Sequence, residues 1–339
     1  MSLRSSESSF GPSPIRSTVD FRRDGVQHGF LRLPYSRDDS AWGAVMIPIT
    51  VVRSGDGPTA LLTGGNHGDE YEGPIALLKL AAALRPEQIR GRVIVLPAMN
   101  YPAFRAQKRT SPIDGGNLNR SFPGRPDGTV TEKIADYIHR ELLPLAEYVL
   151  DYHSGGRTLT FLPFAAAHEL PDKAQEARCI AAMEAFAAPW SVVMRELDSV
   201  GMYDTVAEAM GKVFVTTELG GSGTATAETV RIAERGVHNF LVHAGILQAE
   251  PRPAPTRHLT MPSDDCFVVS EGDGLVEFCF DLGEPVAPGD EIVRLHPVDA
   301  CGRPAESYRA RLGGILAGRH VPGLAQPGDC LAVVAVPAD

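Results

Sequence analysis

Long apolar runs, paired cysteines and clusters of basic residues are all missing from this sequence of 339 residues. No apolar run is long enough to cross a bilayer, and the N-terminus lacks the apolar core of a signal peptide, so neither a membrane span nor a secretory leader is expected. The formal net charge is −10, and Lys and Arg are scattered along the chain. Nucleic acid and anionic membranes are therefore poor partners.

The five cysteines are an odd number and include no CxxC pair. Neither a disulfide framework nor a thiolate zinc site is indicated, and a reducing cytoplasm is the expected compartment. Lysine is also missing from the C-terminal part of the chain, because the last one is Lys212. The phrase GEPVAPGDEIV resembles biotinyl and lipoyl carrier domains, but without a lysine for attachment a carrier role is disfavoured.

Short apolar runs alternate with helical patterns from about Trp42 to Gly245. TALLTGG and GRVIVLPAMN are typical of buried strands, and EGPIALLKLAAALR between them has apolar residues at helical spacing. The same pattern of helices and strands continues through five further segments. It predicts an α/β fold with a mostly parallel, mixed sheet and helices on both faces.

The pattern changes at PRPAPTRH, residues 251–258, where prolines crowd together and a linker is expected. Short alternating strands separated by Gly-Asp and Pro-Gly turns follow, and they predict a small all-β barrel or sandwich. We therefore expect three parts: an N-terminal arm and first strand (1–40), a catalytic α/β domain (41–250) and a C-terminal β domain (258–339). The last part is expected to cover the mouth of an active site or to support contacts in a homo-oligomer.

Three of the predicted strands end in residues that ligate metals or transfer protons. TALLTGG leads into His67 and Glu70, VLDYH ends at His153, and FVTTE ends at Glu218. Because the carboxyl ends of parallel strands face one crevice, these side chains should converge. Two imidazoles and one carboxylate leave a fourth coordination position open, which is typical of catalytic zinc. An HxxE spacing is common by chance, but the glycines around it allow turns that aim both side chains at one point.

Four motifs in order resemble the succinylglutamate desuccinylase and aspartoacylase family, whose members share the fold of zinc carboxypeptidases: GGNHGDEYEG, NLNRSFPG, LDYHSGG and TELGG. The resemblance covers roughly residues 41–245. It implies a zinc-dependent amidohydrolase with one Zn²⁺ per chain. In this family pattern His67, Glu70 and His153 match the zinc ligands, and Glu218 matches the general base.

The resemblance implies further roles around the expected metal. Asn119 and Arg120 match the pair that grips the α-carboxylate of the substrate, for which a planar guanidinium is well suited. Arg109 falls near the arginine that polarises the scissile carbonyl, and Arg105 competes for this role because the spacing to Arg120 is longer than in aspartoacylase.

Asp151 lies two residues before His153, on the same face of one predicted strand. It is expected either to accept a hydrogen bond from a metal-binding histidine or to be a buried structural aspartate. The other eight histidines have no partner at a ligand spacing and are expected to be surface or hydrogen-bonded residues: His28, His139, His168, His238, His243, His258, His296 and His320.

The expected reaction is zinc-dependent hydrolysis of the amide bond of a small N-acyl amino acid. The segment after Arg157 is apolar and suits a small, uncharged acyl group such as acetyl. The runs from residue 28 to 43 and from 111 to 137 resemble the branch of the family that acts in ectoine breakdown, so Nα-acetyl-L-2,4-diaminobutyrate is the leading substrate. Succinylglutamate, N-acetylaspartate, peptides cleaved by a carboxypeptidase, and zinc binding without turnover are the alternatives.

A substrate that carries an amine should meet a carboxylate. The segment MRELDSVGMYD offers Glu196, Asp198 and Asp204, of which Asp198 is the expected partner. The alternative interpretation is a solvated acidic loop.

Overall fold

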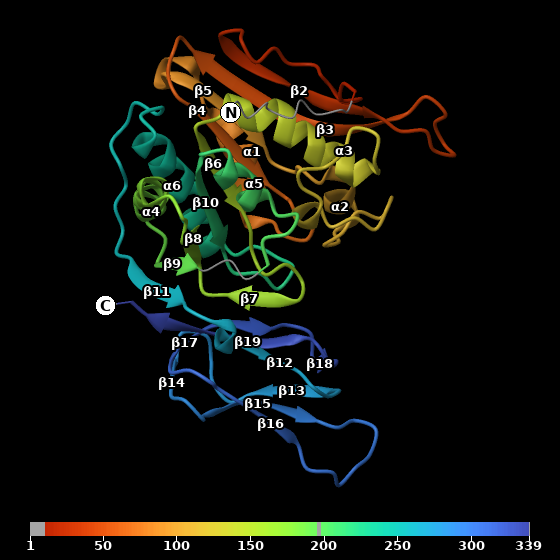
Figure 1. Ribbon diagram of the computed structural model, residues 1–339, viewed down its shortest axis with the longest axis vertical. Coiled ribbons are helices and arrows are strands. Elements are labelled where there is room, and N and C mark those ends of the chain that lie inside the picture. Colours follow the sequence, from red (N-terminus) through yellow and green to blue (C-terminus); the bar gives the residue numbers. More distant parts are fainter. Residues whose placement is uncertain (1–10, 195–197, 339) are drawn as a thin grey trace, which may run out of the picture.

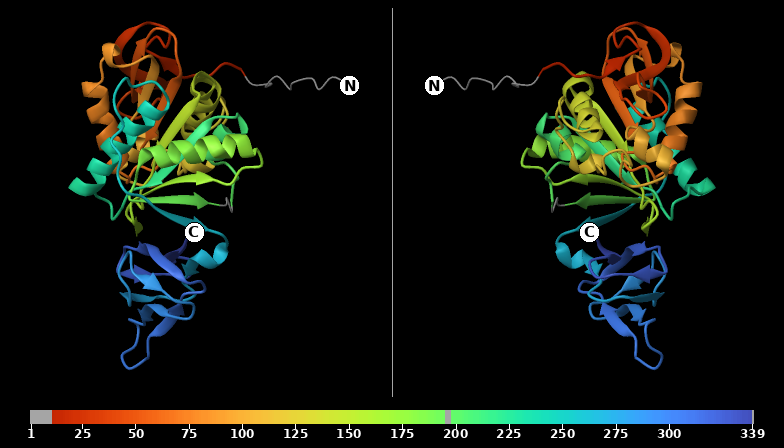
Figure 2. Two further views of the ribbon diagram at one scale, coloured as in Figure 1. Left: turned by 90° about the vertical axis from the view of Figure 1, so that its left-hand side faces the viewer. Right: turned by 90° about the vertical axis from the view of Figure 1, so that its right-hand side faces the viewer.

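The computed structural model describes residues 11–194 and 198–338. Figure 1 shows a large α/β body, to which the described residues up to about 250 belong, and a smaller β unit built from the C-terminal part. The two views of Figure 2 place the β unit at one end of the body, next to the strands that precede it in the chain. No helix within the described ranges is both long and apolar enough to cross a membrane.

The main sheet contains fifteen strands among the described residues and runs through both parts. β5, β4, β6 and β10 run parallel to one another, whereas β3 pairs antiparallel with β5 and β8 pairs antiparallel with β10. The predicted mostly parallel, mixed sheet is therefore confirmed. Its spatial order is β1 (Arg16–Ser17), β2 (Gly25–Pro34), β3 (Ala44–Ser54), β5 (Gly91–Leu96), β4 (Thr59–Gly64), β6 (Tyr148–Tyr152), β10 (Val213–Glu218), β8 (Phe164–His168), β9 (Trp190–Met194), β11 (Arg257–Met261), β19 (Cys330–Pro337), β17 (Gly314–His320) and β14 (Pro285–Val286).

Alternation along the central strands sends side chains into two separate cores. Leu62 and Val215 belong to one core, with α1 (Glu72–Ala83), α4 (Lys173–Phe186) and α6 (Ala227–His243). Leu61 and Phe214 belong to the other, with α3 (Val130–Tyr137) and α5 (Tyr203–Ala209). The remaining helical segments are α2 (Tyr101–Ala106) and the short turns η1 (Pro86–Gln88), η2 (Leu118–Arg120), η3 (Ile138–Leu142), η4 (Leu143–Leu145) and η5 (Asp264–Cys266).

The C-terminal unit has its own core and a second, four-stranded sheet. This sheet has the order β16 (Glu306–Arg309), β15 (Glu291–His296), β13 (Gly274–Phe278) and β18 (Leu324–Ala325). Two further strands, β12 (Phe267–Val269) and β7 (Leu159–Phe161), pair with β19 and β17 of the main sheet.

The boundary between body and tail is crossed by both the sheet and the core. β11 pairs with β9 on one side and β19 on the other, and its first residue, Arg257, lies inside the expected linker. Phe164 and Val192 of the body share a buried cluster with Val333 of the tail. The division into 1–40, 41–250 and 258–339 stays a proposal.

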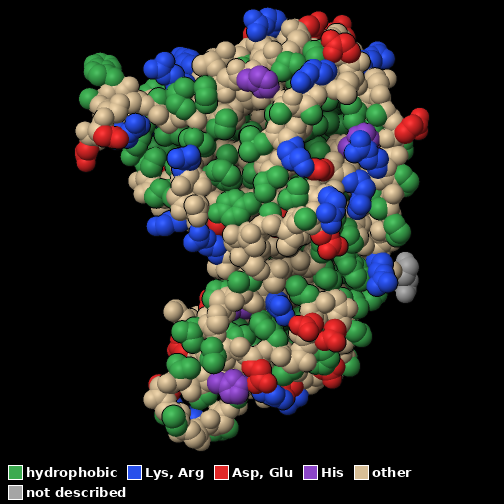
Figure 3. All heavy atoms as spheres, turned by 180° about the vertical axis from the view of Figure 1, so that it is seen from behind, with side chains coloured by type: hydrophobic (Ala, Val, Ile, Leu, Met, Phe, Trp, Pro, Cys, Tyr) green, Lys and Arg blue, Asp and Glu red, His purple; other side chains and the backbone are tan. Residues whose placement is uncertain are grey.

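The surface in Figure 3 carries Lys and Arg side chains interspersed with Asp, Glu and uncharged groups. This distribution agrees with the scattered basic residues of the sequence.

Candidate metal centre and active site

The loop after β4 brings two polar side chains into the interior. Gly65 has φ +64, and a Cβ at Gly68 would lie 2.0 Å from the carbonyl carbon of Ala103. The chain can therefore turn back tightly toward α1 only with glycine at these positions. The turn leaves the side chains of His67 and Glu70 only 3% and 2% exposed.

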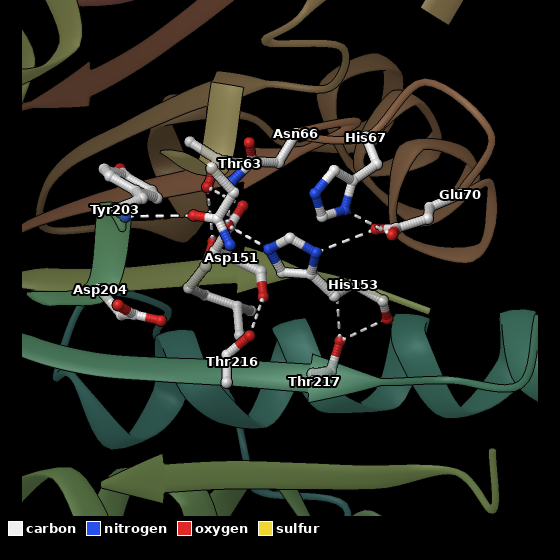
Figure 4. A network of polar contacts seen from close by, with 12 residues as sticks. Thr63, Asn66, His67, Glu70, Asp151, His153, Tyr203, Asp204, Thr216 and Thr217 are labelled. Carbon is white, nitrogen blue, oxygen red and sulfur yellow. Dashed lines mark hydrogen bonds and ion pairs between the residues drawn. The ribbon is translucent and has the colours of Figure 1, made fainter. Parts of the chain in front are cut away.

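Glu70 lies between two imidazole rings that follow two different strands, His67 after β4 and His153 after β6 (Figure 4). Its Oε1 is 2.7 Å from Nδ1 of His67, and its Oε2 is 3.0 Å from Nδ1 of His153. The two ring centroids are 5.0 Å apart. The candidate ligand atoms of these three residues all lie within 4.8 Å of one another, so the group could hold a metal ion.

Asp151 fixes the orientation of the His153 ring from the opposite side. Its Oδ2 lies 2.8 Å from Nε2 of His153 and accepts from Nδ2 of Asn66 at 3.1 Å. Its Oδ1 accepts from the hydroxyl of Thr63 at 2.6 Å. Because Nε2 is engaged with the aspartate, Nδ1 of His153 faces Glu70, which is the arrangement that orients histidine ligands in metal sites.

The pKa values in this group are set by burial and by mutual attraction. Burial opposes ionisation of Glu70, but His67 and His153 outweigh it and hold the pKa of the carboxyl well below its usual range. Burial also opposes protonation of His153, yet Asp151 and Glu70 raise its pKa well above the usual value. For His67, burial dominates and lowers the pKa. Glu70 is therefore held as a carboxylate, the form that binds a cation.

Glu218, the last residue of β10, lies beside this group. Its Oε2 is buried and has no hydrogen-bond partner among the described residues. Burial, followed by repulsion from Glu70, raises the pKa of Glu218 to about 8, while His153 and Arg109 act in the opposite direction. A cation between the histidines would lower this value, because positive charge favours the carboxylate.

One cavity of about 200 Å³ collects most of the predicted site residues together with several others. Glu70 and Asp151 lie outside its lining. The cavity is lined by His67, Arg109, Asn119, Arg120, His153, His168, Met194, Met202, Asp204, Thr216 and Glu218.

The two competing arginines occupy different places. Arg109 lines this cavity, with Nη1 3.7 Å from Oε1 of Glu70. Arg105 lines a separate hollow with Tyr71 and Phe104. Of the two, the structure places Arg109 closer to the group that could bind a metal.

Asn119 and Arg120 lie on the short turn η2, which the side chain of Asn117 caps. Oδ1 of Asn119 accepts from the backbone N–H of Tyr203 at 3.1 Å, which directs the amide nitrogen of Asn119 away from α5. Nη1 of Arg120 donates to the backbone carbonyl of Asn119 at 2.7 Å. The two side chains are thus held next to each other at the wall of the cavity.

The acids proposed for an amine fall in three different places. Asp198 is 67% exposed, with Oδ2 3.8 Å from Nε of Arg120, and it does not line the cavity. Asp204 is buried and lines it. Glu196 lies outside the described residues.

Sequence reasoning missed four residues of the lining. His168 was expected to be a surface or hydrogen-bonded residue; it is hydrogen-bonded to Oε1 of Glu208 at 2.9 Å, but it is buried in the cavity wall. The register of β8 and β9 pairs it with Met194. Met202 and Thr216 complete the set. The available signal was weak, since the positions follow from strand pairing rather than from a motif.

A buried His-Glu-His group at the carboxyl ends of parallel strands, beside a glutamate whose Oε2 has no hydrogen-bond partner in the described part of the chain, has the geometry of a metal-dependent hydrolase. The sequence model of the succinylglutamate desuccinylase/aspartoacylase catalytic domain matches residues 56–244, and the chain belongs to this family. The family resemblance drawn from the motifs is confirmed.

Several relatives match almost the whole chain. N-alpha-acetyl-L-2,4-diaminobutyric acid deacetylase of Halomonas elongata is 56% identical over 326 residues, which cover 96% of this chain and 95% of the relative. The product-bound structure of the ectoine utilization protein EutE (DoeB) from Ruegeria pomeroyi is 63% identical, with a TM-score of 0.95 and coverage of 96% and 99%. A succinylglutamate desuccinylase/aspartoacylase structure from Rhodobacter sphaeroides is 41% identical, with a TM-score of 0.92 and coverage of 96% and 100%.

Proposed function

We propose that this protein hydrolyses the amide bond of Nα-acetyl-L-2,4-diaminobutyrate and releases acetate and L-2,4-diaminobutyrate. The observation that carries the proposal is the 56% identity, over nearly the full length, to a relative named for this deacetylation. The buried group of His67, Glu70 and His153 supports it, because the proposed hydrolysis depends on a metal ion and these three residues could hold one.

The donor set fits a single zinc ion held by Nδ1 of His67, Nδ1 of His153 and the carboxylate of Glu70. Two nitrogen donors and one oxygen donor match the ligand preference of zinc, and three protein ligands are the number that catalytic zinc sites use. When bound, the ion supplies Lewis-acid polarisation of the acyl carbonyl and makes water more acidic. Asp151 keeps His153 in the tautomer that presents Nδ1.

Glu218 moves the proton. Its Oε2 has no hydrogen-bond partner among the described residues and can accept a proton from the attacking water as the new C–O bond forms. The same oxygen then gives the proton to the amide nitrogen, so that the C–N bond breaks and a neutral amine leaves.

Three residues on one wall of the cavity position the substrate. Arg120 and the amide nitrogen of Asn119 bind its α-carboxylate, for which a guanidinium offers two parallel N–H donors. Arg109 donates to the acyl oxygen as negative charge develops there, which stabilises the transition state more than the ground state.

We also infer that the protein works in the cytoplasm as a homo-oligomer. The five cysteines among the described residues are all free thiols, as a reducing compartment requires. Trp42 is 97% exposed, and we propose that a second copy of the chain covers it. A monomeric mass by light scattering at micromolar concentration would contradict the oligomer.

The substrate assignment is tested with four compounds under identical conditions: Nα-acetyl-L-2,4-diaminobutyrate, N-succinyl-L-glutamate, N-acetyl-L-aspartate and a short unblocked peptide. We expect kcat/KM for the first compound to exceed the value for each of the others by at least about 100-fold. A substrate that leaves charged groups of the cavity wall unpaired loses much of its transition-state binding. Preference for a succinyl or aspartyl compound would replace the proposed substrate within the family. Release of free amino acids from the peptide would instead indicate a carboxypeptidase.

A further inference from the structure

One end of the cavity is built from residues for which the proposed chemistry has no use. His67, His153 and Glu218 define the reacting end, and Arg109, Asn119 and Arg120 the wall next to it. The remaining lining consists of one carboxylate, one imidazole, one hydroxyl and two thioethers: Asp204, His168, Thr216, Met194 and Met202.

Strand pairing places part of this set on the face of the sheet that carries the reacting end. Thr216 and Glu218 are two residues apart on β10, so their side chains leave the same face. β8 runs antiparallel to β10, and its register pairs His168 with Met194 on β9. The cavity therefore extends from Glu218 back along β10 toward the middle of the strand.

Asp204 lies on α5, and a hydrogen bond connects α5 to the cavity wall that contains Asn119 and Arg120. The backbone N–H of Tyr203 donates to Oδ1 of Asn119, and Asp204 is the next residue along the chain. Tyr203 is anchored by stacking on Phe122, with centroids 4.8 Å apart. In Figure 4, Asp204 lies beside β10 on the side of His153 that faces away from Glu70. The hydrogen bond and the ring stacking therefore fix the position of Asp204 relative to Asn119.

Asp204 is a buried carboxylate with one oxygen available. The residue is 7% exposed, and its Oδ1 accepts from the backbone N–H and the hydroxyl of Thr205. Its Oδ2 has no hydrogen bond among the described residues, although the side chain faces the cavity. Burial raises the pKa of Asp204; His168 lowers it in part and Glu208 adds to the rise. A cation in the cavity would complete the electrostatic pairing that this carboxylate lacks.

We propose that Oδ2 of Asp204 binds the side-chain ammonium group of the substrate, and that Met194 and Met202 pack against the methylenes leading to it. Asp204 is then the residue that selects a diamino acid over a neutral amino acid of the same size. This inference rests on the proposed deacetylation. It also replaces Asp198, because an acid that is 67% exposed and close to Arg120 offers an ammonium group a far weaker, water-screened contact.

The test compares two acetylated amino acids that differ only at the end of the side chain. In Nα-acetyl-L-2,4-diaminobutyrate an ammonium group stands where N-acetyl-L-norvaline has a methyl group. Asp204→Asn is expected to lower the ratio of the two kcat/KM values by at least about 30-fold, because one partner of a buried ion pair is lost. The rate on the norvaline compound should change by less than about threefold.

A second variant keeps the test valid if Asp204→Asn folds poorly, as judged by circular dichroism and thermal melting. Asp204→Glu carries the carboxylate one methylene further into the cavity. It is expected to shift preference toward the shorter substrate Nα-acetyl-L-2,3-diaminopropionate. Asp198→Asn tests the rival acid, and Asp56→Asn removes the same charge from a fully exposed position. Both should leave the amine-to-methyl ratio within about threefold of the wild-type value.

The outcomes are distinct. An unchanged ratio in Asp204→Asn, or an equal loss on both substrates, would overturn the role of Asp204 and leave the deacetylation standing. A loss of selectivity in Asp198→Asn alone would return the role to Asp198. If the wild-type protein hydrolysed neither acetylated compound, the proposed function itself would fail.

Discussion

Glu218→Gln is expected to reduce kcat by about 10³-fold, because a primary amide cannot accept the proton that a carboxylate takes from water. The substitution keeps the size and shape of a side chain that lies at the end of β10 in the cavity wall. Oε2 of Glu218 makes no hydrogen bond with the described residues, so replacing it breaks none and the fold should tolerate the change. Steady-state kinetics with metal content measured on the same samples provides the check.

The pH profile separates loss of a base from loss of structure. The base is the carboxylate form of Glu218, so wild-type kcat/KM should rise with pH until this group is ionised. Its pKa is raised to about 8 by burial and by Glu70 in the absence of a cation, and bound zinc will move the rising limb to lower pH. The residual rate of Glu218→Gln should lack that limb.

Glu228→Gln is a matched control, because Glu228 lies in the exposed first turn of α6. It should keep the wild-type rate and profile. If Glu218→Gln kept kcat within about threefold of the wild type, Glu218 would not be the base.

The convergence of the site could be predicted because it follows from a rule about parallel strands. β4, β6 and β10 are neighbours, and the loop or strand end of each carries His67, His153 or Glu218. Short motifs and the direction of the strands were enough to bring these residues together, and the alternation of side chains placed Asp151 on the face of His153.

The far end of the cavity could not be predicted because it depends on pairings that local sequence does not specify. His168 reaches the cavity because β8 enters antiparallel to β10, and nothing within residues 164–168 indicates that direction. Asp198 and Asp204 lie in one polar stretch without periodicity. The packing of α5 buries only Asp204 of the two, through ring contacts of Tyr203 with Phe122 and Phe214.

The same reason explains the junction with the tail. The prolines of residues 251–258 predicted a linker, and residues 251–256 form no helix or strand. They could not show that the next strand, β11, would join the main sheet beside β9 and carry it into the C-terminal unit.

His153→Ala is expected to abolish metal binding, so that metal content falls from one ion per chain to a small fraction of that value. The substitution removes one of three donor groups and leaves Glu70 and Asp151, two buried carboxylates, without the imidazole that lies between them. Both groups then lose a hydrogen-bond partner, which should also lower the stability of the protein by about 3 kcal/mol.

Metal content after dialysis, together with thermal melting in the presence and absence of chelator, checks this prediction. Wild-type protein should melt at lower temperature when chelator is added, because a ligand that binds only the folded state stabilises it. His153→Ala should melt at one temperature regardless of chelator. Asp151→Asn should lie between the two, with metal affinity reduced about 10- to 100-fold, since it disturbs only the orientation of His153.

His296→Ala serves as the control, because His296 pairs with Glu277 at the surface of the tail, away from the cavity. It should retain one equivalent of metal and the response to chelator. A His153→Ala protein that still held one ion with wild-type affinity would show that the metal binds elsewhere. The roles given to Glu70, Asp151 and Glu218 would then lose their common basis, because each was assigned from its position relative to this histidine.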